Sequence, residues 1–194
     1  MRIIAGKAKG RTFTAPEGRS TRPTLDRVRE AMFGMIQFDV EGAAVLDLFA
    51  GSGGLGLEAL SRGADMAVFN DSDRNAARLI EKNLASLGLG ENAEVYCLDC
   101  FQLIAACAGR ELKFSIVLLD PPYASGLYEL VFASLASAGV LEDGCIILAE
   151  HSAKMPLSID LPCFLAGKPH RYGDVAVTKF IYRTGSAEPS LEEQ

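Results

Sequence analysis

The sequence predicts an α/β domain built on a mostly parallel sheet of seven strands, and two observations support this. First, five apolar segments of strand length alternate with helix-like segments between residues 43 and 150. Strands that are apolar throughout are typical of a parallel sheet covered by helices on both faces. Second, a glycine-rich turn, DLFAGSGGLG (47–56), lies between the first of these strands and a helix. This strand–turn–helix unit indicates a Rossmann-like fold.

The elements before residue 43 are predicted to be a basic arm and a helix. Residues 1–23 form the arm, in which the loose alternation of residues 2–14 and their two glycines indicate a small β-hairpin. A helix follows, with Thr24 as its cap. Its buried stripe is predicted from apolar residues at helical spacing, namely Leu25, Val28, Met32 and Ile36. Three arginines near its start are expected to face outward: Arg22, Arg27 and Arg29.

The remaining elements form one domain, predicted to span residues 24–183. Residues 163–183 read as two strands joined by a turn at Tyr172–Gly173, which predicts an antiparallel hairpin at the C-terminal edge. The polar residues 184–194 are expected to be a disordered tail. The five strands of the parallel part are predicted at 43–49, 66–71, 93–99, 114–120 and 144–150, with helices after the first four.

The bulk composition predicts a cytoplasmic protein. The 194 residues are 49% hydrophobic, which suffices for one domain with a substantial core. No apolar run approaches the ~20 residues of a membrane helix, and the N-terminus lacks the apolar stretch of a secretory signal. Five cysteines without framework spacing indicate reduced thiols.

Charge is distributed unevenly along the chain. The net charge is −6, yet residues 1–30 hold eight basic and three acidic side chains. That segment therefore carries +5, which leaves −6 − 5 = −11 for the remainder. Such asymmetry indicates either a basic face that contacts nucleic acid or a solvated basic hairpin without a partner.

The glycine turn predicts a nucleotide-like cofactor. Gly51, Gly53 and Gly56 match the dinucleotide-binding pattern, and Asp71 lies 20 residues after Gly51, where an acid can hold a ribose. Both a nicotinamide cofactor and S-adenosylmethionine fit this pattern. Asp47 favours the second, because its carboxylate suits a cationic amino-acid group better than a pyrophosphate.

Two details of this cofactor site stay open on the sequence alone. Asp99, at the end of the third strand, either accepts a hydrogen bond from an adenine amino group or caps the next helix. At the end of the second strand, Asp71 is preferred to Asp73 as the ribose ligand, because Asp73 can cap the following helix.

A second site is predicted where the fourth strand ends in DPPY, Asp120, Pro121, Pro122 and Tyr123. Residues before prolines stay extended, so the Asp120 carboxylate and the Pro121 carbonyl form a stiff pair of acceptors. Such a pair can bind both hydrogens of a nucleobase amino group and direct its lone pair at a methyl donor, while Tyr123 stacks on the base. A base within a helix would have to be flipped out. A dehydrogenase has no comparable use for this tetrad, so a methyltransferase is favoured.

These motifs, together with RIIAGKAKGR, TRPTLDRVREAMFGMI, LDLFAGSGGLGLEALSRGA and RYGDVAV, resemble the bacterial 16S ribosomal RNA guanine-N2 methyltransferases of the guanine(966) type, over residues 2 to about 183. The resemblance implies a class I methyltransferase fold. It also implies methylation of a guanine N2 in 16S ribosomal RNA within the assembled or partly assembled small ribosomal subunit, by a monomer. The donor would be S-adenosylmethionine, with S-adenosylhomocysteine as product.

Carried over by position, the resemblance also assigns site residues. The methionine end of the cofactor would be surrounded by Asp47, Phe49, Ala50, Gly51, Ser52 and Gly53. Asp71 would hold the ribose, Asp99 and the Cys100 backbone the adenine, and Asp120 to Tyr123 the guanine. RNA phosphates would meet five basic residues, Lys7, Lys9, Arg11, Arg22 and Arg27. The family usually has an apolar residue and Glu where this chain has Asn70 and Asp71.

Other chemistries are less well supported. Cys97 and Cys100 have metal-like spacing, but no second pair accompanies them, so no metal is predicted. His151 and His170 have no evident catalytic partner and are expected at the surface or in the hairpin. Two alternatives remain, a DNA adenine or cytosine amino-methyltransferase and a non-enzymatic RNA-binding module.

Overall fold

The computed structural model describes residues 1–15, 23–121, 127–155 and 157–185. Arg22, Pro122, Tyr123 and nearly all of the predicted tail lie outside these described residues. No helix among the described residues is long and apolar enough to cross a membrane.

The fold is one twisted sheet in the order β3-β2-β1-β4-β5-β8-β6, with β7 also paired to β8. Strands β1 to β5 run parallel to one another, and β8 runs antiparallel to β5. This confirms the predicted sheet with its antiparallel C-terminal edge. The bounds are β1 Ala44–Asp47, β2 Met66–Asn70, β3 Ala93–Tyr96, β4 Phe114–Leu119, β5 Leu141–Ser152, β6 Phe164–Ala166, β7 His170–Tyr172 and β8 Val175–Tyr182.

The sheet has eight strands rather than seven because the first half of the C-terminal hairpin is split. β6 and β7 pair with different parts of β8 and are separated by residues 167–169. This interruption contains Pro169, which has no N–H to donate to a ladder.

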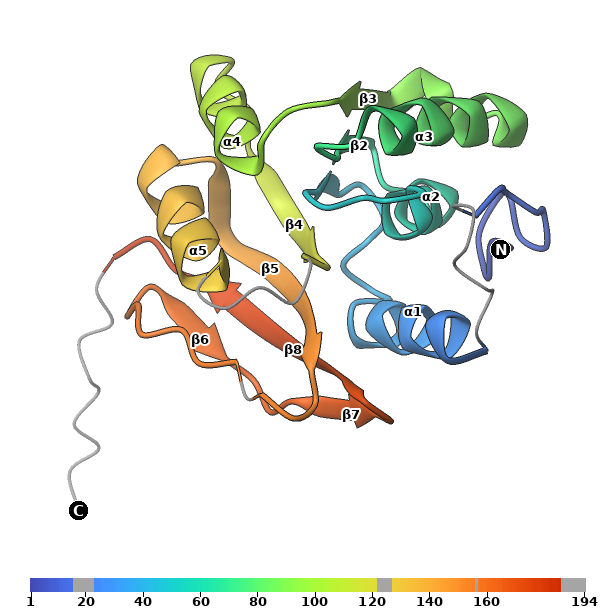
Figure 1. The fold of residues 1–194 in the computed structure, drawn as a ribbon. Coiled ribbons are helices and arrows are strands. Elements are labelled where there is room, and N and C mark those ends of the chain that lie inside the picture. The colour runs from blue at the N-terminus through green and yellow to red at the C-terminus, as the bar shows by residue number, and fades with distance from the viewer. Residues whose placement is uncertain (16–22, 122–126, 156, 186–194) are drawn as a thin grey trace.

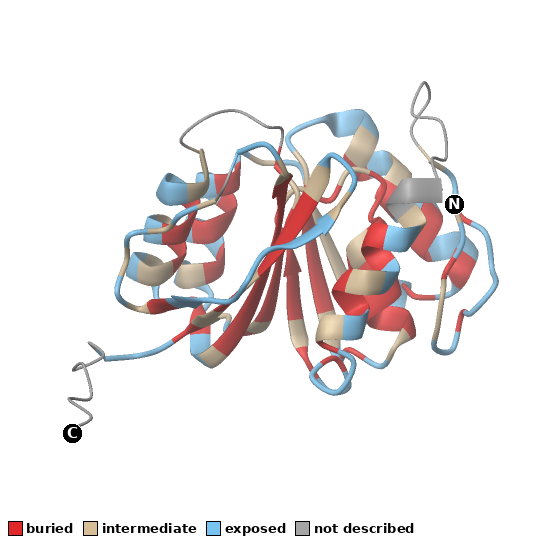
Figure 2. Ribbon diagram, turned by 90° about the horizontal axis from the view of Figure 1, so that it is seen from below, coloured by how far each residue is buried: buried red, intermediate tan, exposed pale blue. Residues whose placement is uncertain are grey.

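Helices cover both faces of the sheet, as Figures 1 and 2 show. Helices α1, α2 and α3 bury their apolar stripes in one cluster, in which Met32, Leu57 and Ile80 are fully buried. Helices α4 and α5 form the other cluster, with Leu103 and Phe132. The bounds are α1 Pro23–Met35, α2 Gly54–Ser61, α3 Arg74–Leu87, α4 Cys100–Gly109 and α5 Leu127–Ala138, and a short 3₁₀ turn covers Gly90–Asn92.

Helix α1 confirms the predicted stripe but not the predicted cap. Val28, Met32 and Ile36, the last just past the end of the helix, are buried, and the side chain of Leu25 lies outside the described residues. The helix begins at Pro23, one residue before Thr24. Proline suits the first position of a helix because its φ angle is preset and its missing N–H would have had no helical partner.

Arg29 was expected to face outward and is instead 3% exposed. Its Nη2 donates to Asp26 Oδ1 at 2.9 Å and to the carbonyl of Arg2 at 2.6 Å, and its Nε lies 3.8 Å from Glu58 Oε2. Burial is tolerated because two carboxylates compensate the charge.

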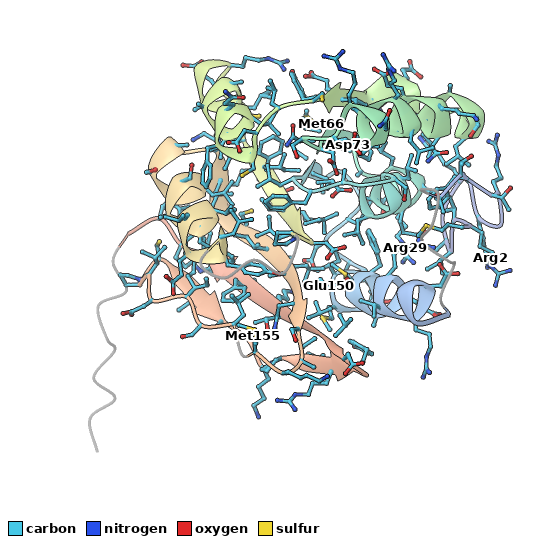
Figure 3. All side chains as sticks on the ribbon, in the orientation of Figure 1. Arg2, Arg29, Met66, Asp73, Glu150 and Met155 are labelled. Carbon is cyan, nitrogen blue, oxygen red and sulfur yellow. The ribbon has the colours of Figure 1, made fainter. Side chains whose placement is uncertain are left out.

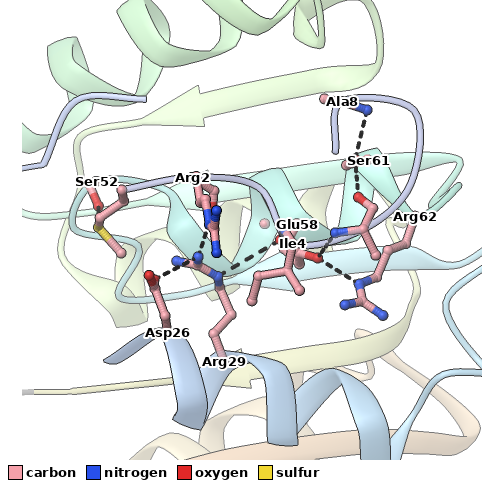
Figure 4. A network of polar contacts seen from close by, with 12 residues as sticks. Arg2, Ile4, Ala8, Asp26, Arg29, Ser52, Glu58, Ser61 and Arg62 are labelled. Atoms are coloured by element: carbon pink, nitrogen blue, oxygen red, sulfur yellow. Dashed lines mark hydrogen bonds and ion pairs between the residues drawn. The ribbon is translucent and has the colours of Figure 1, made fainter. Parts of the chain in front are cut away.

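Residues 1–15 fold back on themselves against α2, as the predicted hairpin arm requires, with one antiparallel bridge between Arg2 and Thr12 and backbone hydrogen bonds from Ile3 to Arg11 and from Phe13 to Met1. The fully buried Glu58 carboxylate accepts the N–H groups of Ile4 and Ala5, at 2.8 and 2.9 Å, and also Nε of Arg62 (Figure 4). At Gly6, φ is +81°, and an added Cβ would lie 1.7 Å from the Ser61 carbonyl oxygen. The contact between the arm and α2 therefore requires glycine at position 6.

Candidate active site

Each of the five parallel strands has an acidic residue near its carboxyl end, either within its last three residues or up to three residues beyond it. These residues are Asp47, Asp71, Asp99, Asp120 and Glu150. Because all five strands run in the same direction, the acids gather along one edge of the sheet, where open α/β sheets bind their ligands. An edge of this kind attracts a cationic ligand.

Asp47 is the most deeply buried of these acids, with 1% of its surface exposed. Its Oδ2 accepts the Gly56 N–H at 2.9 Å in the first turns of α2. Burial, together with the charges of Asp120 and Asp71, raises the pKa of Asp47 to about 7 despite the lowering effect of the Gly56 hydrogen bond. The surroundings of Asp47 disfavour its ionised form. A cation bound at this edge would stabilise that form and would in turn be stabilised by it.

The glycine turn is shaped by backbone conformation and by close packing. Gly51 and Gly53 have φ angles of +57° and +82°. A Cβ added to Gly51 would meet no atom within 4 Å, so the space beside this residue is open to a ligand. Gly56 serves packing instead, because its Cβ would lie 2.2 Å from the Phe69 ring.

Asp71 and Asp73 differ clearly in their contacts. Asp71 Oδ2 accepts the Gly51 N–H at 2.9 Å, and its Oδ1 accepts the Asp73 N–H at the same distance. Asp73 lies at the start of α3 (Figure 3) and accepts the Asn75 N–H at 2.8 Å, which confirms its predicted capping role. The carboxylate that borders the glycine turn is therefore that of Asp71.

We expect Asp71→Ala to weaken S-adenosylmethionine binding roughly 10- to 100-fold, the loss typical of a charged hydrogen-bond partner. Titration calorimetry measures the affinity directly. The matched variant, Asp73→Ala, should leave the affinity unchanged and cost about 1 kcal/mol of stability through removal of the helix cap. Unchanged affinity in Asp71→Ala, with weaker binding in Asp73→Ala, would reverse the assignment.

Asn70 is a residue of the site whose role the sequence reasoning missed. It is 1% exposed, its side-chain N–H groups donate to the carbonyls of Leu48 and Leu98, and its Oδ1 accepts the Leu98 N–H. It thereby ties the loops that follow β1 and β3. A polar residue at the end of an apolar strand was the available signal.

On the adenine side, Asp99 Oδ1 accepts the Phe101 N–H at 2.9 Å and so caps α4. The capping alternative is thus confirmed, and the contact with adenine stays a prediction. Cys100 is buried at the first position of α4, in the apolar cluster formed with α5. Phe49, beyond β1, is partly buried and packs against this cluster. Ala50 and Ser52 are buried within the glycine turn.

Asp120 and Pro121 follow β4, and Asp120 is half-buried between the ends of β1 and β5. The pairing of Leu119 with Ala149 brings Asp120 level with Glu150, which Figure 3 shows close to the tip of β4. Glu150 is 7% exposed, and its carbonyl accepts the hydroxyl of Tyr128. Glu150 is therefore the next acidic residue after Asp120 along this edge of the sheet.

The two histidines differ from each other. His170 is exposed in β7, as expected, but His151 is buried, and its Nε2 lies 2.9 Å from Thr178 Oγ1. The expectation for His151 was wrong because this residue belongs to β5, where it pairs with Ala176 of β8. Among the described residues, no group of three or more His, Cys, Asp or Glu side chains is placed to hold a metal ion.

The predicted RNA-contacting residues also have different surroundings. Lys7, Lys9 and Arg27 are exposed. The guanidinium of Arg11 donates to the carbonyls of Ser86 and Leu87, at 2.5 and 2.6 Å, and so satisfies the C-terminal end of α3. Among the predicted arm contacts that the structure describes, Lys7 and Lys9 therefore extend their charges into solvent.

Comparison with known proteins adds to this geometry. Residues 1–181 match the family described as "Conserved hypothetical protein 95". The chain is 40% identical over 179 residues to YlbH of Bacillus subtilis, and the aligned region covers 92% of this chain and 91% of YlbH. It is also 40% identical over 150 residues to "Ribosomal RNA small subunit methyltransferase D" of Escherichia coli K12, covering 77% and 74%. The solved structure of yhhF from Escherichia coli has a TM-score of 0.84 at 32% identity and covers 95% and 99%.

Proposed function

The chain belongs to the conserved hypothetical protein 95 family, and from this membership we propose that it is an S-adenosylmethionine-dependent RNA methyltransferase. The target is the exocyclic N2 amino group of one guanine in 16S ribosomal RNA, in the assembled or partly assembled small subunit. The protein acts as a monomer in the cytoplasm, where this RNA is found. The Escherichia coli relative named for small-subunit ribosomal RNA supports the substrate.

The observation that carries the proposal is the meeting of Asp47, Asp71 and Asp120 beside an open glycine turn. S-adenosylmethionine supplies a methyl group on a positively charged sulfur and carries a cationic amino group. Asp47 and Asp71 fit these properties, since one is a buried acid and the other borders the open space at Gly51.

At the neighbouring strand end, Asp120 and the Pro121 carbonyl accept the two hydrogens of the guanine amino group. This contact holds the nitrogen and directs its lone pair toward the donor, so positioning supplies much of the rate. The nitrogen–carbon bond forms as the carbon–sulfur bond breaks, and the methylated amine then loses one proton. Asp120 can accept that proton before it passes to water.

The affinity for S-adenosylmethionine is expected to rise about tenfold between pH 6 and pH 8, because Asp47 has a pKa of about 7 and attracts a cation only when ionised. The stability of the cofactor-free protein should change in the opposite direction. Between pH 3.8 and about 7 the folded chain holds a proton that the unfolded chain has released, so the free energy of unfolding falls as pH rises.

Calorimetry between pH 6 and pH 8 measures the trend in affinity. Thermal unfolding of the cofactor-free protein between pH 3.8 and about 7 measures the trend in stability. Asp47→Asn keeps an acceptor for the Gly56 N–H and should abolish both. An affinity that stays independent of pH in the parent protein would show that Asp47 does not meet the cationic cofactor.

The proposed reaction is tested by transfer of tritium from labelled S-adenosylmethionine to isolated small subunits, naked 16S ribosomal RNA and duplex DNA. Incorporation into RNA or subunits, with N2-methylguanine found by mass spectrometry of the digest, is the expected result. Incorporation into DNA alone would identify the DNA amino-methyltransferase. Absence of both transfer and cofactor binding would leave the non-enzymatic RNA-binding module.

A further inference from the structure

Positive charge is concentrated in a second segment of the chain besides the N-terminal one. Residues 164–183 contain four basic side chains, Lys168, Arg171, Lys179 and Arg183, and one acid, Asp174, for a charge of +3. With +5 in residues 1–30, the rest of the chain carries −6 − 5 − 3 = −14. The two basic segments are thus exceptions in a strongly acidic protein.

The fold places the arm, residues 1–15, and residues 164–183 on either side of helix α1. On one side, the Arg29 side chain donates to the Arg2 carbonyl in the arm. On the other, Lys179 Nζ donates to the Met35 carbonyl at 3.4 Å and lies 3.9 Å from Asp39. Figure 1 shows the arm, α1 and β7 in succession along one side of the molecule. Arg27, on α1 between them, is exposed.

The C-terminal hairpin, residues 164–183, also flanks the edge that holds the acids. Val177 pairs with Glu150 on one side and with His170 on the other, so β7 begins level with Glu150 and extends beyond it. A substrate whose base reaches Asp120 therefore has this hairpin beside it.

A hollow of about 460 Å³ lies between the end of α1 and the hairpin. Its polar lining comes from Lys168, His170 and Lys179, and its apolar lining includes Met35, Leu165 and Ile181. No acid is among the described residues that line it. Lys168 beside an apolar floor suits a phosphate backbone with a base or ribose lying against the protein, whereas Lys179 is already paired with Asp39.

Two cations of the hairpin are available for such a contact. Lys168 and Arg171 are exposed, and no carboxylate lies within 4 Å of either within the described part of the chain. By contrast, Lys154, which precedes the hairpin, already has a carboxylate partner, because it pairs with Asp174 at 3.2 Å.

We propose that the C-terminal hairpin is a second RNA-binding flank, on which Lys168 and Arg171 contact phosphates of the substrate. The inference rests on the proposed function and adds to it a path for the RNA, from Lys7 and Lys9 across α1 to β7. RNA is favoured over an acidic protein because the hairpin continues the basic face of the arm and borders the edge at which the base is methylated.

The test compares the parent protein with Lys168→Ala/Arg171→Ala and with a control, Arg78→Ala/Lys82→Ala. The control pair is exposed on α3, which packs over the opposite end of the sheet, and it removes the same charge. Binding of naked 16S ribosomal RNA and of small subunits is measured between 50 and 200 mM salt. The hairpin variant should lower the slope of log affinity against log salt by about 1 for each phosphate that the protein no longer neutralises. It should also raise KM for RNA while S-adenosylmethionine affinity stays unchanged.

Three outcomes would overturn the inference. A hairpin variant with the slope and KM of the control would mean that the hairpin contacts no phosphate. Weaker binding confined to small subunits, with naked RNA binding unchanged, would assign the hairpin to a protein component. A parent protein that transfers methyl groups to DNA alone, or that binds no RNA, would remove the proposed function and this inference with it. The first two outcomes leave the proposed function intact.

Discussion

Replacing Asp120 with asparagine is expected to lower kcat for RNA methylation about 10²–10³-fold, the usual loss for one preorganised polar contact in a transition state. Asparagine keeps the shape but presents an N–H₂ group or an uncharged oxygen to the guanine amine. The contact that orients the nitrogen is therefore weakened or becomes repulsive. Single-turnover transfer of labelled methyl to small subunits measures the chemical step.

Cofactor affinity separates this effect from a general disturbance of the edge. Asp120 raises the pKa of Asp47, so its replacement by a neutral residue should leave S-adenosylmethionine binding unchanged or slightly stronger. Asp120→Ala should lose at least as much activity. Turnover close to that of the parent in either variant would remove Asp120 from the reaction.

Glu58→Ala is expected to destabilise the fold by about 3–5 kcal/mol, the cost of leaving a buried charge without its partner. Glu58 is fully buried and accepts two backbone N–H groups of the arm and Arg62 Nε, while Arg29 is buried beside it. Its removal leaves both the arm and the Arg29 guanidinium without these interactions. Denaturant unfolding measures the change in stability.

The matched control for Glu58 is Glu94→Ala, which removes an exposed carboxylate paired with Arg110. Surface pairs contribute little, so this variant should unfold close to the parent protein. Hydrogen exchange at the Ile4 and Ala5 amides provides a local reading and should accelerate in Glu58→Ala alone. Equal stability of the two variants would show that the arm does not depend on the buried carboxylate.

The parallel sheet was predictable because β1, β2, β4 and the second half of β5 are almost wholly buried, so each is largely a run of apolar residues that needs no tertiary information. The edge strand β3 is only half-buried and contains Glu94. The C-terminal edge was less predictable. The split between β6 and β7 depends on how Gly167 approaches β8, where its N–H donates to the Lys179 carbonyl at 2.8 Å. Neither apolar pattern nor turn residues specify that hydrogen bond.

For the candidate site, strand ends were informative and long-range partners were not. Asp47, Asp71 and Asp120 were predicted to lie together because each ends or follows an apolar run, and parallel strands bring such residues together. Arg29 was misplaced because its burial depends on Glu58, 29 positions later in the sequence. Asn70 was missed for a similar reason, since its partners belong to two other loops.

Ile3, Ala8 and Phe13 of the arm are buried in the same cluster as α1, α2 and α3. The arm is therefore interior structure on one side and solvent-facing on the other, and Lys7 and Lys9 are mounted on a rigid base. For an RNA substrate, the separation between these two lysines and Asp120 is set once, when the chain folds. If the proposed RNA contacts form, we expect a guanine to be selected by its distance from a bound phosphate as well as by its own chemistry.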